Sequence, residues 1–407
     1  MLGPHFPPDT APTGVVLGRI VEELAHLGHE IEVVTSLPWY RDHAIEGEWQ
    51  GHAIQRELTG WGRITRVHPF PADKGDLLRR GLAFIGFTGL AGTVAGSLDR
   101  VDAVVAMSPP LTLGAAAIGV GRRHRAPVVF NVQDIFPDVA VELGAITNPR
   151  LIAAAQRLER WSYQHSDAVT VLSDELAQNV EAKAAGRTRV CMIPNFVDTV
   201  AITPMDRMTD YRIELGLADE TVVLYAGNVG FSQSLEMVIE CARRLSGRSD
   251  LTFVINGSGS ARASLERSAE GLTNVRFGEF QPAERLGEVL ATGDIHVVPL
   301  KTGLARSSVP SKSYSVMAAG RPLLASVDPG TEVARMAERT GAGLAVAPDD
   351  ADALCDALVQ MADDPVGRAR MGAAGRAEVL ERASPAAVGA AYDQLLGELV
   401  TGRSRRR

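Results

Sequence analysis

A lysine in the first turn of a predicted helix is the residue of this sequence that most clearly suggests chemistry. Pro310 and Ser311 begin the helix, and the Ser311 hydroxyl can cap it. Lys312 follows in the first turn, where a cation opposes the helix dipole; the placement makes sense if an anion is bound beside the free N–H groups. The segment therefore predicts an anion site, with a solvated lysine as the alternative. Glu332, at the start of the next predicted helix, would be stabilised by the dipole in either case.

Glycines at three junctions that lead into predicted helices could admit a phosphate or a sugar. Gly14 opens the first predicted helix. Gly227 follows a predicted strand and precedes Asn228, whose amide can donate and accept hydrogen bonds near a diphosphate. Gly257 follows the next strand. Without a Cβ these residues let a ligand approach backbone N–H groups, but each could equally be only a tight turn. No GxGxxG pattern occurs, which counts against a dinucleotide fingerprint.

A carboxylate near the end of another predicted strand is the candidate catalytic group of the N-terminal half. Asp134 comes shortly after the strand Pro127–Val132, and Pro137 ends the loop. A side chain at the carboxyl end of a parallel strand is placed to face a ligand cleft. The alternative is that Asp134 caps the next turn, a common role for aspartate.

Apolar strand-like runs alternate with longer helical patterns along the chain, which indicates parallel sheets with crossover helices. One array ends at Pro194-Asn195, a second begins near Val222, and Val200–Asp210 is a plausible linker. We therefore predict an α/β protein with two Rossmann-like, doubly wound domains that face each other across a cleft. The expected domains are 1–199, 200–384 and a C-terminal segment, 385–407, that returns as a helix to the first domain and ends in a basic tail. The expected strands are Ile31–Thr35, Val101–Met107, Pro127–Val132, Ala168–Leu172, Val190–Ile193, Val222–Ala226, Thr252–Ile255, Val275–Phe277, Ile295–Val298 and Leu323–Ser326.

The bulk composition is that of a globular protein and argues against a nucleic-acid partner. The formal net charge of the 407 residues is -8, so the general electrostatic attraction to phosphate backbones is missing. Three cysteines lie far apart without metal-ligand spacing and are expected to be buried thiols in a reducing compartment. No signal-peptide pattern is visible, so we expect a cytoplasmic protein. Because only Met1–Gly3 precede the first loop, most of the first strand is expected to be missing from this sequence.

An uncharged run, Leu82–Leu98, follows the basic residues Lys74, Arg79 and Arg80. It is slightly short for a membrane span and contains several glycines, which are costly in an isolated helix. A buried helix is the main expectation. The alternative is an interfacial helix with the basic residues at lipid headgroups, which would give the protein a peripheral contact with the inner membrane.

Segments spread over nearly the whole chain resemble, in the same order, those of glycosyltransferase family 4, whose members have the GT-B fold. The resemblance is to the subgroup that includes bacterial polysaccharide transferases of the colanic-acid and N-acetylfucosamine type. The segments are HFPPDTAPTG (5–14), LAHLGHEIEVVTS (24–36), VVFNVQDIFPD (128–138), MIPNFVD (192–198), YAGNVGFSQSLEMVIECA (225–242), VVPLKTG (297–303) and VPSKSYSVMAAGRPLLAS (309–326).

The resemblance implies a transferase that moves a sugar, with retention of configuration, from a nucleotide diphosphate donor without a tightly bound metal or other cofactor. A UDP-sugar is the favoured donor, with UDP-N-acetylhexosamine slightly ahead. The acceptor would be a glycan, a lipid-linked sugar or a small molecule such as a secondary metabolite. The C-terminal domain would bind the donor and the N-terminal domain the acceptor, whose hydroxyl Asp134 would position.

Residue by residue, the resemblance assigns further roles. Gly14 matches the family's N-terminal loop near the transferred group. Lys312 and the Ser311 backbone match the cradle of the diphosphate, where positive charge stabilises the leaving group. Phe280 lies where the family's backbone contacts the base. The candidate catalytic residues are thus Asp134 and Lys312, and the candidate donor-binding residues are Gly14, Gly227, Asn228, Gln233, Gly257, Phe280, Pro310, Ser311, Lys312, Ser315 and Glu332.

Two pairs of residues depart from the family's pattern. Much of the family carries two glutamates before the MAAG stretch, where Ser307 and Ser315 stand here. The common Arg and Lys after the first strand of the second domain align with Asn228 and Gln233. Ser315 would hold ribose hydroxyls less strongly than a carboxylate does. Lys312 is therefore the clearest remaining cation, and two further basic residues precede it, Lys301 and Arg306.

Two other functions are compatible with these residues. A GT-B sugar-nucleotide 2-epimerase would need acid/base carboxylates and histidines in the cleft. His5, His26 and His29 lie near the first helix, but the last two belong to a turn with a structural role. The second alternative is a non-catalytic, nucleotide-sugar-binding partner that has lost the family's glutamates.

Overall fold

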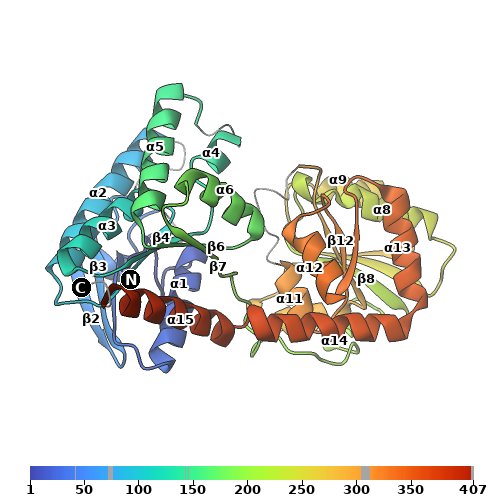
Figure 1. The fold of residues 1–407 in the computed structure, drawn as a ribbon. Helices are drawn as coiled ribbons and strands as arrows, with labels where there is room; N and C mark the ends of the chain where they lie inside the picture. Colours follow the sequence, from blue (N-terminus) through green and yellow to red (C-terminus); the bar gives the residue numbers. More distant parts are fainter. Residues whose placement is uncertain (42, 72–76, 143, 145, 304–311, 405–407) are drawn as a thin grey trace. The chain divides into compact units, whose positions relative to one another are not determined.

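The chain divides into two compact units, each with its own sheet and core. The computed structural model describes residues 1–41, 43–71, 77–142, 144, 146–303 and 312–404. Unit 1 comprises Met1–Asn195 together with Val388–Arg407, and unit 2 comprises Phe196–Ala387. The end of the chain therefore groups with the N-terminal unit (Figure 1).

The sheet of unit 1 contains a three-stranded part, β1-β3-β2, and a four-stranded part, β4-β5-β6-β7. Its strands are β1 (Ile31–Ser36), β2 (Ile54–Thr59), β3 (Gly62–Val67), β4 (Val104–Ser108), β5 (Val128–Val132), β6 (Ala168–Val171) and β7 (Arg189–Met192). Neighbours pair in parallel except β2 and β3, which pair antiparallel. Leu2 makes parallel bridges to both Val34 of β1 and Ala106 of β4, so the first residues lie between the two parts of the sheet.

Helices cover both faces of this sheet (Figure 1). They are α1 (Pro12–His26), α2 (Leu77–Ser97), α3 (Thr112–His124), α4 (Asp138–Glu142), α5 (Pro149–His165), α6 (Asp174–Ala184) and α15 (Pro385–Ser404), with a 3-10 turn, η1 (Gly47–Trp49). Phe87 of α2 and Leu113 of α3 share a core with Phe130 of β5. The next residue of β5, Asn131, points to the other face and meets Tyr392 of α15.

The first helix begins at Pro12, earlier than the predicted start at Gly14. Proline suits the first helical position because its φ is preset and its missing N–H would be unpaired there anyway. The helix buries one apolar stripe and stops before Gly28, whose φ is +92°. The residues of the stripe recur at helical spacing: Leu17, Ile20, Val21 and Leu24.

A buried polar network anchors the C-terminal helix to the sheet of unit 1. Asn131 Nδ2 donates to Tyr392 Oη at 2.7 Å and to Thr170 Oγ1 at 3.0 Å. The amide of Gln133 donates to Asn131 Oδ1 at 2.7 Å, and Asn195 donates to Gln133 at 2.9 Å. The network thus includes both the last residue before unit 2 and a residue of the helix that follows it.

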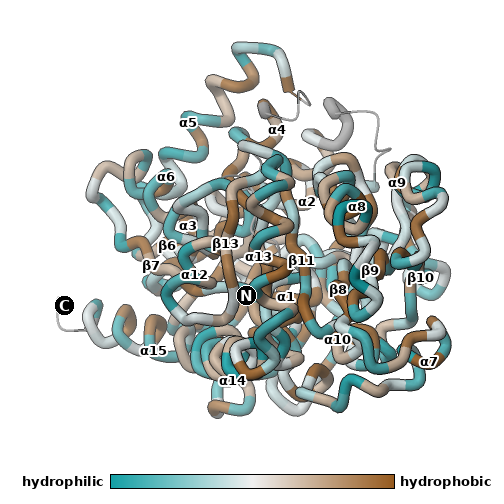
Figure 2. Tube along the Cα trace, turned by 90° about the vertical axis from the view of Figure 1, so that its right-hand side faces the viewer, coloured by the Kyte–Doolittle hydropathy of each residue, from teal (hydrophilic) through white to brown (hydrophobic). Residues whose placement is uncertain are grey.

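Unit 2 contains a six-stranded parallel sheet in the order β10-β9-β8-β11-β12-β13. The strands are β8 (Thr221–Ala226), β9 (Leu251–Asn256), β10 (Val275–Gly278), β11 (Ile295–Pro299), β12 (Leu323–Ser326) and β13 (Gly343–Val346). Most of these strands are buried along their length, and β8, β11 and β13 stand out as apolar in Figure 2. Continuous apolar runs are typical of strands covered on both faces.

The helices of unit 2 form two layers around this sheet. They are α7 (Asp210–Glu214), α8 (Leu235–Arg244), α9 (Arg262–Ser268), α10 (Leu286–Thr292), α11 (Lys312–Ala318), α12 (Glu332–Thr340), α13 (Ala351–Asp363) and α14 (Pro365–Arg382), with 3-10 turns η2 (Phe231–Gln233) and η3 (Ala283–Arg285). Helices α8, α9 and α13 share one core, and α11, α12 and α14 share another. Two doubly wound α/β units are therefore confirmed.

Residues 200–210, predicted as a linker, are packed into unit 2. Ile202 is buried in the core that α11 and α14 share. Arg207 forms an ion pair of 3.3 Å with Asp294, which precedes β11. The linker prediction was wrong because an apolar side chain and a paired arginine hold this segment in place.

The uncharged run predicted as a helix lies in α2. Phe87 and Ala91 are buried, whereas Leu82 and Ile85 are 61% and 58% exposed. From residue 81 onward, where its side chains are described, the helix is therefore buried along one face only. Among the residues that the structure describes, no helix is long and apolar enough to cross a membrane.

Candidate functional site

Lys312, at the start of α11, reaches the carboxyl end of strand β8. Its Nζ donates a hydrogen bond to Tyr225 Oη at 2.7 Å and lies 4.1 Å from the centre of the Tyr225 ring. Tyr225, itself buried, donates to the backbone carbonyl of Asn228 in the following loop. A Cβ on Gly227 would lie 3.0 Å from the Lys312 ammonium. The ammonium is thus held over an aromatic face beside the glycine loop, a favourable position for a cation.

Burial lowers the pKa of Lys312 to about 8. Desolvation is the cause, and no ion pair joins Lys312 to a carboxylate in the described part of the chain. An anion beside Nζ would offset the cost of burying the charge and would raise the pKa again. The arrangement therefore favours a negatively charged ligand at the end of β8.

Two glycines let the loops after β8 and β9 pack against each other. Gly227 and Gly257 have φ values of +141° and +134°, which side chains with a Cβ rarely adopt. Gly227 N donates to Asn256 O at 2.9 Å, and a Cβ on Gly257 would overlap the carbonyl oxygen of Gly227. Gly257 is therefore required by backbone packing at the strand ends, and Gly227 is favoured by its positive φ and by the nearby Lys312 side chain.

Asn228 and Gln233, which the resemblance aligns with the family's Arg and Lys, follow β8. Asn228 is exposed, and its carbonyl accepts the Tyr225 hydrogen bond. Gln233 is half-buried, and its Oε1 accepts a hydrogen bond from Gly230 N at 3.0 Å. The Gln233 side-chain oxygen thus stabilises its own loop, and among the described residues no hydrogen bond from its amide nitrogen is found.

The loop after β11 is fastened to the loop after β8. Lys301 N donates to Ser232 O at 3.0 Å. The Asp349 carboxylate accepts from Ser234 Oγ at 2.7 Å and from Thr302 Oγ1 at 2.8 Å. These hydrogen bonds hold the pKa of Asp349 below its usual range. The Lys301 backbone is therefore fixed near the glycine loop.

The other predicted donor-binding residues of unit 2 lie on separate elements. Ser315 is half-buried in α11, and Phe280, after β10, is 68% exposed. Glu332 begins α12, where the dipole favours its charge, and pairs with Arg335 at 3.2 Å. Four residues of the predicted site fall outside the described residues: Arg306, Ser307, Pro310 and Ser311.

Gly14 lies in the first turn of α1 and packs against the loop that precedes the helix. A Cβ there would lie 2.9 Å from the Cβ of His5 and 3.1 Å from its carbonyl carbon. The structure thus gives a packing reason for this glycine, in addition to the ligand approach that the sequence suggests.

Asp134 is exposed in the loop after β5. It follows Gln133, whose side chain belongs to the buried network, and precedes the buried Ile135. Partial desolvation raises the pKa of Asp134. Helix α4 begins only at Asp138, and within the described residues no hydrogen bond to the Asp134 carboxylate supports the capping alternative. The carboxylate is thus available to a ligand.

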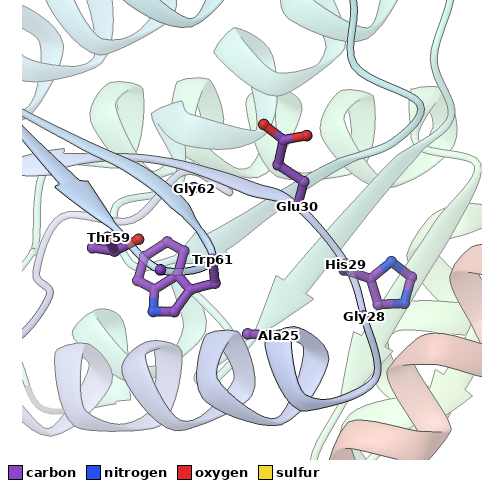
Figure 3. Close-up of a pocket in the computed structure, with 8 residues that line it drawn as sticks. Ala25, Gly28, His29, Glu30, Thr59, Trp61 and Gly62 are labelled. Carbon is purple, nitrogen blue, oxygen red and sulfur yellow. The ribbon is translucent and has the colours of Figure 1, made fainter.

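A shallow pocket in unit 1 lies at the amino ends of the strands, opposite to the end that carries Asp134 (Figure 3). Trp61 and Glu30, next to the amino ends of β3 and β1, line it together with His29. His29 Nε2 forms a 2.7 Å contact with Asp393 of α15. His29 is therefore paired with α15 and lies at the amino end of β1, whereas His5 lies at the carboxyl end. These two histidines, considered for an epimerase, are thus not brought together.

Sequence reasoning missed two groups at the strand ends. One is Tyr225, which lies two positions before Gly227 and could have been found as the inward-facing aromatic residue of the YAGN segment. The other is the pair His5 and Asp9, whose side chains are 2.8 Å apart. In the sequence, only their spacing of four residues could have indicated this contact. In the part of the chain that the structure describes, no group of three or more His, Cys, Asp or Glu side chains could hold a metal ion.

Both halves of the chain match models of glycosyltransferase domains. A "Glycosyl transferase 4-like domain" matches residues 13–195, and "Glycosyl transferases group 1" matches residues 220–364. With two doubly wound units, the fold and these matches define a glycosyltransferase of the GT-B type. The chain belongs to glycosyltransferase family 4, as its sequence segments predict.

Individual relatives agree with this assignment. The chain is 29% identical to "Putative colanic acid biosynthesis glycosyl transferase WcaI" of Escherichia coli, over 88% of this chain and 90% of that protein. It is 28% identical to a "GDP-mannose-dependent monoacylated alpha-(1-6)-phosphatidylinositol monomannoside mannosyltransferase" of Corynebacterium glutamicum, over 52% of this chain and 57% of that protein. Among solved structures, sucrose-phosphate synthase of Thermosynechococcus elongatus has the same fold, with a TM-score of 0.73 at 16% identity and 98% coverage of both chains.

Proposed function

We propose that this protein is a retaining glycosyltransferase that uses a nucleotide diphosphate sugar, with UDP-sugars as the first donor class and UDP-N-acetylhexosamine among them. The acceptor is a glycan, a lipid-linked sugar or a small molecule, received by unit 1. The observation that carries the proposal is the desolvated Lys312 ammonium beside Gly227, without an ion pair to a described carboxylate. A group in this state is suited to the two negative charges of a diphosphate.

In this mechanism the reaction proceeds on one face of the donor sugar. The acceptor oxygen bonds to the anomeric carbon as the bond from that carbon to the diphosphate breaks on the same face. The acceptor proton passes to the departing phosphate oxygen, so no protein nucleophile is needed. Lys312 stabilises the charge that develops on the diphosphate, and Asp134 positions the acceptor hydroxyl. The proposal includes no metal, because the lysine and backbone N–H groups supply the positive charge.

Donor binding is tested first by thermal unfolding in the presence of UDP-, GDP-, dTDP- and ADP-sugars. A ligand at 100 times its dissociation constant adds about 2.7 kcal/mol to the stability of the protein. We expect UDP-sugars to raise the unfolding temperature most. GDP-sugars are the main competing donor class, because the names of two relatives specify GDP-mannose. No stabilisation by any of the four classes would contradict the proposal.

Asp134→Asn is expected to lower the rate of sugar transfer by about 10-fold while leaving donor stabilisation unchanged, since an amide positions a hydroxyl less well than a carboxylate. The rate is measured with saturating donor and varied acceptor. Asp99→Asn, an exposed aspartate elsewhere in unit 1, is the matched control. An unchanged rate in Asp134→Asn would remove this carboxylate from the mechanism.

The same assays test the alternative of a non-catalytic partner. Such a protein would be stabilised by a nucleotide-sugar but would neither hydrolyse it nor transfer the sugar to any glycan or lipid acceptor. The serines at Ser307 and Ser315, in place of the family's glutamates, are the observation that keeps this alternative open.

We further propose that unit 1 makes a peripheral contact with the inner face of the cytoplasmic membrane. Leu82 and Ile85 project from α2 away from the buried Phe87 and Ala91. An apolar helix face of this kind, after basic residues, suits the boundary between headgroups and acyl chains.

The protein is therefore expected to sediment with vesicles of anionic phospholipid at low salt. Leu82→Glu with Ile85→Glu should abolish sedimentation, because two charges would enter the acyl boundary. Leu58→Glu, at an 86% exposed position on β2, is the control and should sediment as the wild type does. Equal sedimentation of both variants would place the contact elsewhere.

A further inference from the structure

A histidine and a buried aspartate lie together at the carboxyl edge of the sheet of unit 1. His5 Nδ1 and Asp9 Oδ2 are 2.8 Å apart. The Asp9 side chain is fully buried, and its second oxygen has no hydrogen-bond partner among the described residues. In the tautomer that donates from Nδ1 to this carboxylate, the neutral imidazole presents a lone pair on Nε2.

Aromatic rings surround the imidazole on the loop after β1. The His5 ring stacks on Trp39, with centroids 5.5 Å apart, and meets Tyr40 edge-on at 5.4 Å. His43 contacts both, at 6.3 Å from Trp39 and 6.2 Å from Tyr40. Trp39 is half-buried, and Tyr40 is 41% exposed. The carboxyl edge of β1 thus carries a cluster of rings, which we name the His5 cluster: His5, Trp39, Tyr40 and His43.

The position of His5 is fixed by the surrounding backbone. The buried Arg66 donates hydrogen bonds to the carbonyls of Phe6 and Pro7 and lies 5.0 Å from the Trp49 ring. Ser36 Oγ donates to the carbonyl of Pro4 at 2.6 Å. These contacts fix the backbone on both sides of His5. The imidazole is therefore pre-organised for a ligand.

The cluster has the chemistry of a carbohydrate subsite. Aromatic faces carry partial negative charge and attract the C–H face of a sugar ring. His5 is 9% exposed, and no hydrogen bond from a described residue reaches its Nε2, whose lone pair in the neutral ring can accept a hydrogen bond from a sugar hydroxyl. The two features lie at the strand ends, where open α/β sheets bind ligands. The residues assigned to the diphosphate lie in unit 2, and of the candidate donor-binding residues only Gly14 lies in unit 1, so the rings of the cluster have no role in the proposed donor site.

We propose that the His5 cluster is a subsite for the acceptor, in which a pyranose ring lies against Trp39 and Tyr40 and donates a hydroxyl hydrogen bond to His5 Nε2. The inference rests on the proposed function and specifies its acceptor: a molecule that ends in a sugar ring. Asp9 acts through His5 and is a positioning residue.

Saturation-transfer NMR with methyl glycosides of glucose, galactose and mannose tests the subsite without any donor. We expect saturation transfer from the wild-type protein to the C–H face of at least one of the three rings. Tyr40→Ala removes an exposed ring and should lower the transfer several-fold. Phe70→Ala is the matched control, because Phe70 is 42% exposed and also belongs to unit 1. No transfer from the wild type, or equal transfer from Tyr40→Ala, would overturn the proposal.

His5→Phe separates the hydrogen bond from the stacking, because it keeps a ring against Trp39 and removes Nε2. We expect this variant to raise the acceptor KM by about 10-fold, as for one lost hydrogen bond, with little change in kcat. An unchanged acceptor KM would contradict the role of Nε2.

Thermal unfolding with UDP-glucose distinguishes failure of the subsite from failure of the proposed function. If UDP-glucose raises the unfolding temperature of the wild type but no saturation transfer is seen, the subsite alone is refuted. If no nucleotide-sugar raises the unfolding temperature, the proposed function is refuted.

Discussion

Replacing Lys312 with alanine is expected to lower the turnover of sugar transfer by about 10²-fold, as for other lost groups that stabilise charge in a transition state. The loss corresponds to about 2.7 kcal/mol of transition-state stabilisation. The reason is local: Lys312 is the cation held at the end of β8 by the Tyr225 ring and hydroxyl. The measurement is kcat with the nucleotide-sugar that stabilises the protein best, at saturating acceptor.

Three variants define what Lys312 contributes. Lys312→Met should be as inactive as Lys312→Ala and should unfold at the same or a higher temperature, because it removes a buried charge without emptying its site. Tyr225→Phe should cost a smaller factor, since it removes only the hydroxyl that orients the ammonium. Arg267→Ala, which removes an exposed basic residue of α9, serves as the control and should keep the wild-type activity. Wild-type turnover in Lys312→Ala would exclude this residue from the mechanism.

The pH dependence of donor capture follows from the same residue. Because burial lowers the pKa of Lys312 to about 8, the free enzyme loses this charge as the pH rises through 8. We therefore expect kcat/KM for the donor to fall above that pH with a one-proton slope. The fall in kcat should begin at a higher pH, because the bound diphosphate raises the pKa. Lys312→Arg keeps its charge throughout, so an identical profile in that variant would assign the titration to another group.

Gly257→Ala is expected to destabilise unit 2 by on the order of 3 kcal/mol, since its Cβ would overlap the Gly227 carbonyl and its φ is +134°. For a unit of this size the unfolding temperature should fall by roughly 5–10 °C. Any relaxation would push the two loops apart and shift the backbone N–H groups next to Lys312. Loss of donor stabilisation should therefore accompany the lower unfolding temperature.

Gly247→Ala provides the matched control for this substitution. Nothing lies within 4 Å of a Cβ built on Gly247, and its φ is not among the positive values. We expect its unfolding temperature and donor binding to equal those of the wild type. If Gly257→Ala behaved in the same way, the close packing of the two loops would not be required for the site.

The sequence predicted most of the strands but missed β2, β3 and β13, and it did not predict the contacts at the strand ends. Strand β8 could be read from a run of apolar residues, because burial on both faces leaves a continuous pattern in the sequence. The same pattern could not show that Tyr225 within that strand holds Lys312, 87 positions later, because such a contact depends on how the elements pack. Lys312 itself was singled out because its placement conflicts with the helix dipole.

The sequence also suggested that Gly14 makes room for a ligand, whereas in the structure this glycine is explained by packing against His5. From the sequence, a glycine after Pro-Thr suggests room for a ligand, whereas its missing Cβ makes room for His5. The spacing of His5 and Asp9 could not reveal their pairing, since the loop between them has no regular period. The linker prediction failed for a related reason: the partner of Arg207, Asp294, lies far along the chain.

The return of the C-terminal helix to unit 1 determines how this protein can be recombined with its relatives. A chimera made with one junction near Asn195 would take its last helix from the other parent and lose the match between Tyr392 and Asn131. Unit 2, which we propose to bind the donor, is therefore an insertion in unit 1, and exchanging it requires two junctions, at Asn195–Phe196 and Ala387–Val388. Directed evolution of donor choice in this chain should move that block as one cassette and leave both ends of the chain native.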